Sequence, residues 1–140
     1  MIYTSNYARC GELKTAVAIS ASINDKAKNV WGFKGPHLDF LAPSWSMIHA
    51  YQDGNMDEDE YSKKYIELLI SREINPVDLY KALTFEYDEI ILLCYEPPNK
   101  FCHRRVLAKW IEDANHVEIP EWKSEKEHAQ DQLVDSLLEF

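Results

Sequence analysis

The chain has 140 residues, of which 46% are hydrophobic and 28% charged, and its formal net charge at pH 7 is −9. This length and this balance predict one globular domain over residues 1–140 and exclude a disordered chain. The acidic excess makes nucleic acid a disfavoured partner, since broad binding to DNA or RNA needs clustered Lys and Arg.

Signals for export or membrane insertion are missing from the sequence. The opening, Met1-Ile2-Tyr3-Thr4, has neither the basic nor the apolar region of a signal peptide. No apolar run approaches the roughly 20 residues that a membrane span requires. The three cysteines have spacings that predict no disulfide framework, which favours a reducing compartment. We therefore expect a cytoplasmic protein with no membrane partner.

The first part of the chain predicts two strands, a long connection and a short helix. Residues 2–4 are β-branched and aromatic, and residues 15–20 are apolar on both faces, as in a strand that helices cover on two sides. Gly and Pro interrupt regular structure over residues 20–44, and a stretch of this kind is typical of one that folds over a site. Whether it does so or packs in the core is left open, with packing favoured. A helix over residues 44–51 is expected to bury Trp45, Ile48 and Tyr51.

Two helices with clear start signals follow. Asp57 is expected to cap the first, with Glu60 three residues later and acidic residues at the positive end of the helix dipole. We interpret this acidic run as a solvated helix start rather than a metal site. Asn75-Pro76 opens the second, because proline favours the first helical turn. The inward positions are expected to be Tyr61, Tyr65, Leu68 and Leu69 in the first helix, and Val77, Tyr80 and Leu83 in the second.

The last part of the chain contains the strongest predicted strand. Residues 88–95 are continuous and apolar, which is typical of a central strand. A helix is expected to begin near Cys102, and a short last strand to run over residues 117–119. Ser124 and Glu127 have capping-box spacing and open a C-terminal helix over about residues 124–139. That helix is expected to pack on the domain through Leu133, Val134, Leu137 and Leu138.

Strands that alternate with helices predict an α/β fold, here a three-layer, Rossmann-like domain with a mostly parallel central sheet and helices on both faces. In such sheets, ligands bind at the carboxyl ends of the strands. Three polar segments follow the predicted strands, and we expect them to meet at one edge of the sheet: Ser5-Asn6, Ser20-Ala21-Ser22 and Cys94-Tyr95-Glu96.

The segment from Cys94 to Arg105 carries the most chemistry, because it runs from the central strand into the first turn of a helix. Unpaired N–H groups and the helix dipole favour anions at such a turn. They also favour a thiolate, which makes Cys102 a candidate nucleophile. His103 is a candidate base or donor, and Glu96 a candidate base or orienting partner. The candidate ligand-binding residues are Arg104, Arg105, Cys94, Ser5, Asn6 and Ser20, with the arginines suited to an oxyanion.

Structural interpretations stand beside these roles. Cys94 ends a buried strand, where cysteine behaves as a small hydrophobic residue. Cys102 and His103 are also compatible with a helix start that has no chemistry. One of the two arginines must face away, since neighbours on a helix point in different directions. A zinc site is disfavoured because a closed structural site needs four ligands, so we expect no metal and no cofactor.

This segment, with the opening and the middle of the chain, resembles a family of bacterial and phage proteins known as domain of unknown function 488. The likeness rests on Cys94-Tyr95-Glu96, Cys102-His103-Arg104 and Leu107-Ala108-x-Trp110, supported by Ile2-Tyr3-Thr4-Ser5, Leu41-Ala42-Pro43 and the Tyr61…Tyr65 helix. It implies a parallel sheet with flanking helices and little about activity. Many members carry Gly and His after the first strand and Asp-x-Arg after the second, where this chain has Ser5-Asn6-Tyr7 and Ser20-Ala21-Ser22. If those residues are catalytic elsewhere in the family, the departure implies binding without turnover, or a different substrate.

Three functions follow from the sequence. The leading hypothesis is an enzyme that acts on a nucleotide-like or other anionic small molecule, held at the segment from Cys94 to Arg105. The second is a non-catalytic module that binds or sequesters such a ligand. The third is a phage-encoded acidic interaction protein. The sequence leaves open whether catalysis occurs at all, and it leaves a homodimer open.

Overall fold

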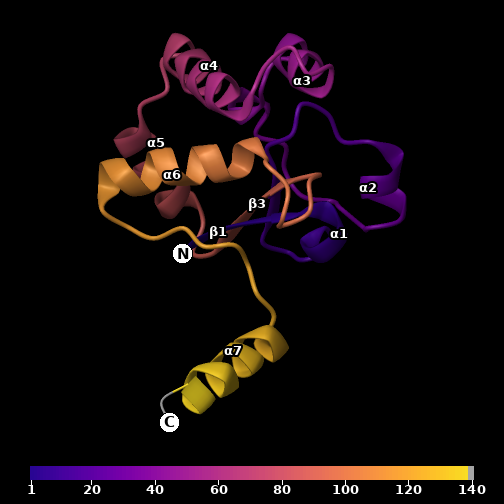
Figure 1. Ribbon diagram of the computed structural model, residues 1–140, viewed down its shortest axis with the longest axis vertical. Coiled ribbons are helices and arrows are strands. Elements are labelled where there is room, and N and C mark those ends of the chain that lie inside the picture. Colours follow the sequence, from indigo (N-terminus) through magenta and orange to yellow (C-terminus); the bar gives the residue numbers. More distant parts are fainter. Residues whose placement is uncertain (139–140) are drawn as a thin grey trace.

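The computed structural model describes residues 1–138 and has an α/β fold (Figure 1). Its sheet has three parallel strands in the order β1-β3-β2. These are β1 (Ile2–Asn6), β2 (Ala16–Ala18) and β3 (Ile90–Cys94). The strand expected to be central is therefore central, while β1 extends beyond the predicted residues 2–4 and β2 is shorter than the predicted residues 15–20.

The helices, in chain order, are α1 (Tyr7–Cys10), α2 (Asp25–Asn29), α3 (Trp45–Gln52), α4 (Glu58–Ser71), α5 (Pro76–Glu86), α6 (His103–Asn115) and α7 (Glu125–Leu138), with a 3-10 turn η1 (Asp39–Leu41). The predicted cap and the predicted proline start are confirmed: the Asp57 side chain accepts from Glu60 N, and Pro76 is the first residue of α5, where the Asn75 side chain adds a cap by accepting from Val77 N. Helix α2 was not predicted. It is too short for an apolar period, and its one signal is Asn24, whose side chain accepts from Ala27 N.

The side chains of β3 alternate between two cores of unequal size. Ile90 and Leu92 pack in the larger core with residues of α3, α4, α5 and α6. Ile91 and Leu93 pack in the smaller core with residues of α1 and α2. Because successive residues of a strand face opposite sides, this alternation shows that helices cover both faces of the sheet. The three-layer prediction is confirmed, with one thick and one thin helical layer.

Short segments cover both edges of the sheet. Beyond β2, Ala18 N donates to Pro36 O and Leu38 N donates to Ala18 O. Beyond β1, Thr4 N donates to Pro120 O and Trp122 N donates to Thr4 O, so the second pairing consists of one bridge between Thr4 and Glu121.

The strand predicted at residues 117–119 is wrong, since these described residues form no strand. Their backbone groups are engaged by side chains instead. Ile119 N donates to the Glu112 carboxylate, and Ile119 O accepts from Arg105. A residue whose N–H and C=O already have partners cannot add a rung to the sheet.

Several positions expected to face the core do not. Trp45 is 54% exposed, and Met47 is the buried residue of α3. In α5 the buried side chains are Leu79 and Leu83, while Val77 is exposed. The remaining corrections are partial, because the following predicted core residues are only half-buried: Ile48, Tyr51, Leu68 and Tyr80.

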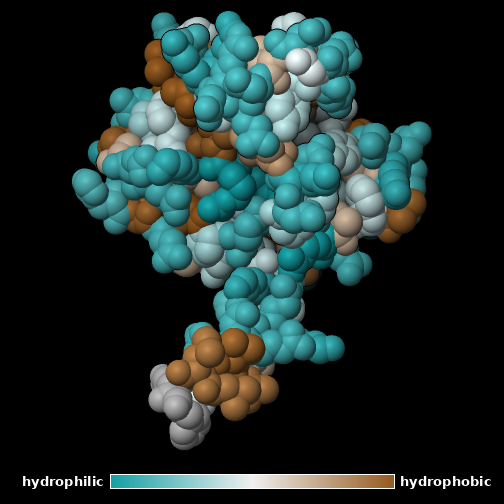
Figure 2. All heavy atoms as spheres, viewed as in Figure 1, coloured by the Kyte–Doolittle hydropathy of each residue, from teal (hydrophilic) through white to brown (hydrophobic). Residues whose placement is uncertain are grey.

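Helix α7 begins as predicted but does not pack as predicted. Ser124 and Glu127 form the capping box, with Glu127 N donating to Ser124 Oγ at 3.2 Å and Ser124 N donating to Glu127 at 3.3 Å. Figure 1 shows α7 projecting from the rest of the described chain, with none of its residues buried. Its leucines and valine form an apolar patch in Figure 2 and are 53–78% exposed. The predicted end at residue 139 lies outside the described residues. None of the helices within residues 1–138 is both long and apolar enough to cross a bilayer.

Candidate functional site

A cavity of about 580 Å³ opens where β2 and β3 end. Ser20 and Ser22 line it after β2, and Cys94 and Glu96 line it at the end of β3. The remaining walls come from the loop before α6, the first residues of α6, and helices α3 and α4. Two of the three polar strand ends expected at one site therefore meet there.

Aromatic rings dominate the wall that faces the strand ends. Tyr51, Tyr61 and Phe101 form a cluster with ring centroids 5.3–5.6 Å apart. Trp45 and Tyr95 line the same cavity, and Trp45 presents more than half of its surface to solvent. The sequence offered no signal for this wall, because its members come from segments that are far apart in the chain. The segment 21–55 thus contributes to the cavity through α3 and to the core through Phe33.

The first turn of α6 forms the floor of the cavity. Cys102 is its N-cap and His103 its first helical residue, and both line the cavity. Among the described residues, no side chain caps this turn. Of the N–H groups in this turn, that of Arg105 donates to Cys102 O at 3.1 Å, so the N–H groups of His103 and Arg104 are left at the positive end of the helix dipole, at the cavity floor.

Two cysteines meet at this floor. Cys94 and Cys102 are joined by a disulfide, with Cα atoms 7.5 Å apart, so the expectation that the cysteines form no disulfide is wrong for this pair. Spacing could not reveal it, because the loop after β3 folds back on the strand. Cys10, the third cysteine, is free and buried in the smaller core, where its thiol donates to Ser5 Oγ at 3.3 Å.

His103 is held in one orientation. Its Nε2 lies 2.8 Å from the carbonyl oxygen of Ile19, which can only accept, so Nε2 carries a hydrogen. Its Nδ1 lies 3.6 Å from Cys102 Sγ. Burial lowers the pKa of His103 to about 4, the hydrogen bond to Ile19 opposes that shift, and the charge of Arg104 adds to it. The imidazole is therefore neutral near pH 7, with the lone pair of Nδ1 directed at sulfur.

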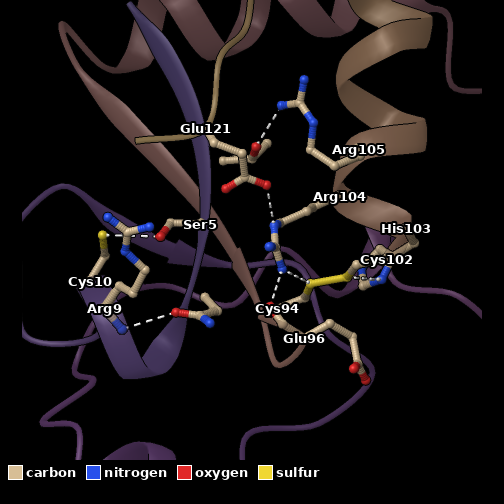
Figure 3. A network of polar contacts seen from close by, with 12 residues as sticks. Ser5, Arg9, Cys10, Cys94, Glu96, Cys102, His103, Arg104, Arg105 and Glu121 are labelled. Atoms are coloured by element: carbon tan, nitrogen blue, oxygen red, sulfur yellow. Dashed lines mark hydrogen bonds and ion pairs between the residues drawn. A yellow bond between two sulfur atoms is a disulfide. The ribbon is translucent and has the colours of Figure 1, made fainter. Parts of the chain in front are cut away.

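Arg104 is fully buried and does not line the cavity, and in Figure 3 its side chain points towards Glu121 and Cys94. Its Nε donates to Glu121 Oε1 at 2.8 Å, and its NH1 donates to Cys94 Sγ at 3.0 Å and to the backbone oxygen of Glu96 at 2.7 Å. The partner of Arg104 is thus the carboxylate of Glu121, whereas the carboxylate of Glu96 is exposed. Arg104 fixes the loop and the end of β3 rather than facing a ligand.

Arg105 and the end of β1 are also engaged inside the protein. Arg105 NH1 donates to Thr4 Oγ1 and to Ile119 O, both at 2.8 Å. Ser5 accepts from Cys10, and Asn6 caps α1 by accepting from Arg9 N at 3.0 Å. The structure therefore brings together Cys94, Glu96, Cys102, His103 and Ser20, and it places Ser5, Asn6 and both arginines elsewhere.

Ser20 holds the end of β2. Its hydroxyl donates to Ser22 O at 2.7 Å, so the Tyr7 hydroxyl, 2.6 Å away, donates to it. Burial raises the pKa of Tyr7 to about 12, and the hydrogen bond to Ser20 opposes part of that shift. Tyr7 therefore stays protonated at neutral pH and acts as a donor in the core.

Comparison with known proteins gives a family. A family model described as the active DUF488-N3 subclade matches residues 21–115, which is more than half of the chain and includes the cavity floor. No curated protein and no solved structure matches. The match agrees with the Cys94-x-Glu96 and Cys102-His103-Arg104 pattern, and the chain belongs to the DUF488 family.

Proposed function

We propose that the chain is an enzyme that binds a nucleotide-like, anionic small molecule in the cavity at the ends of β2 and β3. The observation that carries the proposal is the pairing of an aromatic wall with a floor made by the uncapped start of α6. We also propose a cytoplasmic location, where nucleotides are abundant and where the Cys94–Cys102 disulfide would be reduced.

The size and lining of the cavity support a small-molecule ligand. Its volume of about 580 Å³ lies within the roughly 300–1,000 Å³ of ligand sites, which combine mostly apolar walls with a few polar groups. Planar rings such as Trp45, Tyr51 and Phe101 are suited to stacking against a base. The carboxyl edge of a parallel sheet is also where α/β proteins bind ligands.

The anionic part of the ligand requires donors other than the arginines. Arg104 and Arg105 direct the donors described above at groups inside the protein. The groups that remain are the N–H groups of His103 and Arg104 at the start of α6 and the ammonium of Lys100, which lines the cavity and is exposed. A helix N-terminus with a neighbouring cation favours a phosphate or a carboxylate.

Two observations bear on catalysis. The family model that matches the chain describes an active subclade. In addition, Cys102 and His103 place a sulfur atom and a neutral imidazole at the cavity floor. Against this, the hydroxyl groups of Tyr7 and Ser20 are hydrogen-bonded to each other, near the strand ends at which many relatives carry His and Asp. That contact favours the alternative of a non-catalytic binding module and calls for separate tests of binding and turnover.

Binding is tested by thermal denaturation against nucleotides, cyclic nucleotides, sugar phosphates and inorganic phosphate. A ligand at 100 times its Kd stabilises by about 2.7 kcal/mol, enough to raise Tm by several degrees. We expect Trp45→Ala and Lys100→Gln to reduce the rise in Tm. Phe85→Ala and Lys63→Gln are matched controls, because both residues are exposed and neither lines the cavity. Equal shifts in all four variants, or none in the wild-type protein, would contradict the proposal.

Turnover is tested on any compound that shifts Tm. The compound is incubated with wild-type protein and with Cys102→Ser, and products are followed by chromatography and mass spectrometry. If the enzyme uses Cys102, the wild-type protein makes product and Cys102→Ser does not, while both proteins bind the compound. Binding without product in either protein supports the non-catalytic module.

A further inference from the structure

We infer that Cys94, Cys102 and His103 bind one zinc ion when the two cysteines are reduced. The inference deepens the proposed function. The role of the zinc site towards a ligand in the cavity rests on that function. The metal site itself is independent of any nucleotide and is tested without one.

The three side chains form a compact ligand set. Their Sγ and imidazole nitrogen atoms all lie within 4.8 Å of one another, and all three residues are buried. Thiolate and neutral imidazole are the ligands that zinc prefers in proteins. Sequence spacing argued against zinc because a closed structural site needs four ligands. A catalytic zinc site needs only three, and two cysteines with one histidine is a known set.

A fourth position is available on the cavity side. Cys94, Cys102 and His103 all line the cavity, so an ion bound among them would face the space in which we place the ligand. A zinc ion with three protein ligands holds water or a substrate atom in its fourth position. In this arrangement Cys102 is a metal ligand, which replaces its role as a direct nucleophile.

The imidazole is already oriented as a metal ligand requires. His103 Nε2 donates to the carbonyl of Ile19 at 2.8 Å, which leaves the lone pair of Nδ1 on the side of Cys102 Sγ, 3.6 Å away. The ring of Tyr65 packs against it edge to face, with centroids 5.4 Å apart. Metal-binding histidines usually donate their second N–H to a carbonyl or a carboxylate, which fixes the tautomer and the ring.

The surrounding charges balance a divalent cation. Arg104 NH1 donates to Cys94 Sγ at 3.0 Å, and Arg104 Nε pairs with Glu121 at 2.8 Å. Two thiolates offset the charge of zinc, and the carboxylate of Glu121 offsets that of Arg104. Buried charges are tolerated when they are paired in this way.

The backbone spacing also suits a bridging ion. The Cα atoms of Cys94 and Cys102 are 7.5 Å apart, beyond the roughly 4.4–6.8 Å that disulfides usually span. Two sulfurs bound to one zinc at about 2.3 Å lie roughly 3.8 Å apart, which needs a wider backbone than a disulfide. The disulfide and the zinc site are thus alternative states of the same two sulfurs, and oxidation releases the metal.

The first experiment compares two redox states of the full wild-type chain. Protein reduced with a phosphine is titrated with zinc by calorimetry and in competition with a chromophoric chelator. We expect one zinc per chain in the reduced protein and none after oxidation with glutathione disulfide, which exchanges with the two thiols to leave the Cys94–Cys102 disulfide and two molecules of glutathione. Absence of zinc binding by the reduced protein, or equal binding by both states, overturns the inference.

Variants then assign the ligands. Cys94→Ser, Cys102→Ser and His103→Asn should each weaken zinc binding by at least about tenfold. Cys10→Ser is the matched control, since it also removes a buried thiol but lies outside the cluster. Loss of zinc in Cys10→Ser overturns the assignment. Cobalt titration of the reduced wild-type protein gives a second test that does not depend on whether the variants fold. Charge-transfer absorption from thiolate to cobalt is expected, and its absence overturns the sulfur ligation. Neither result depends on whether a nucleotide binds.

Discussion

Helices α6 and α7 have similar lengths but differ in which of their side chains are buried. In α6 the guanidinium of Arg104 is fully buried, whereas in α7 the apolar side chains, including Leu133 and Leu137, are mostly exposed. Residue type alone predicts the reverse, because arginine is rarely buried and leucine usually is. The difference teaches that burial in this protein follows from the partners that the fold supplies.

The partners of α6 come from three segments. Arg104 reaches the end of β3, the loop that follows it and Glu121 near the edge of β1, so its charge and its N–H groups are used. The chain then leaves this edge, and α7 starts beyond it, held to the domain by the ion pair of Arg9 with Glu127. The capping box made α7 a helix, but no described element offers its apolar side chains a surface.

The largest effect that can break this comparison is expected from Arg104→Ala. It leaves the carboxylate of Glu121 without its cation and the oxygen of Glu96 without its donor. Arg104 is buried but the side chain of Glu121 is 24% exposed, so the free energy of unfolding should fall by up to about 3 kcal/mol in urea titrations, the lower end of the cost of breaking a buried ion pair. An arginine that grips a ligand would instead lose binding while the urea midpoint stays unchanged.

A smaller effect is expected from pH, through His103 in the zinc-free protein. Its pKa is about 4 in the folded chain and 6.5 ordinarily, so the unfolded chain takes up a proton first as pH falls. The stability due to neutral His103 is complete above pH 6.5 and is lost as pH falls towards 4. In His103→Gln, the urea midpoint should depend less on pH over that range than it does in the wild type.

The exposed His128 of α7 gives the control for this measurement, since His128→Gln should keep the wild-type pH dependence. If the wild type and His103→Gln share one profile, the buried, neutral state assigned to His103 is wrong.

The smallest effect is expected in α7. Leu133→Gln and Leu137→Gln should each change the free energy of unfolding by no more than about 0.5 kcal/mol, because both side chains are exposed. A larger loss that depends on protein concentration would show instead that α7 packs against a second copy of the chain, which the sequence left open. Urea titrations at two concentrations, with light scattering, separate these outcomes.

Local signals in the sequence predicted local structure well. Asp57 and Ser124 cap helices as predicted, Pro76 begins α5 as predicted, and the apolar run that contains Cys94 forms the central strand. These features depend on neighbours within a few residues, which a sequence displays directly.

Contacts between segments that lie far apart in the chain could not be predicted from the sequence. The carboxylate of Glu96 was expected to act as a base or to orient an arginine. Arg104 pairs instead with the carboxylate of Glu121 and takes only the backbone oxygen of Glu96, because the chain after α6 returns along β1. The aromatic wall was hidden for the same reason, since Tyr51 and Phe101 pack together only in the folded chain. The segment from Cys94 to Arg105 was the right place to look, but its arginines hold the protein together and its cysteines and histidine face the cavity.

The two bridges that flank the sheet have a consequence for self-association. A three-stranded sheet exposes two edge strands, and bare edges recruit further strands from other molecules. Here the bridge of Ala18 with His37 occupies one side and that of Thr4 with Glu121 the other, each pinned by two backbone hydrogen bonds. A second chain would have to displace these segments before it could pair along either edge of the sheet, so the two bridges oppose edge-to-edge association of folded molecules.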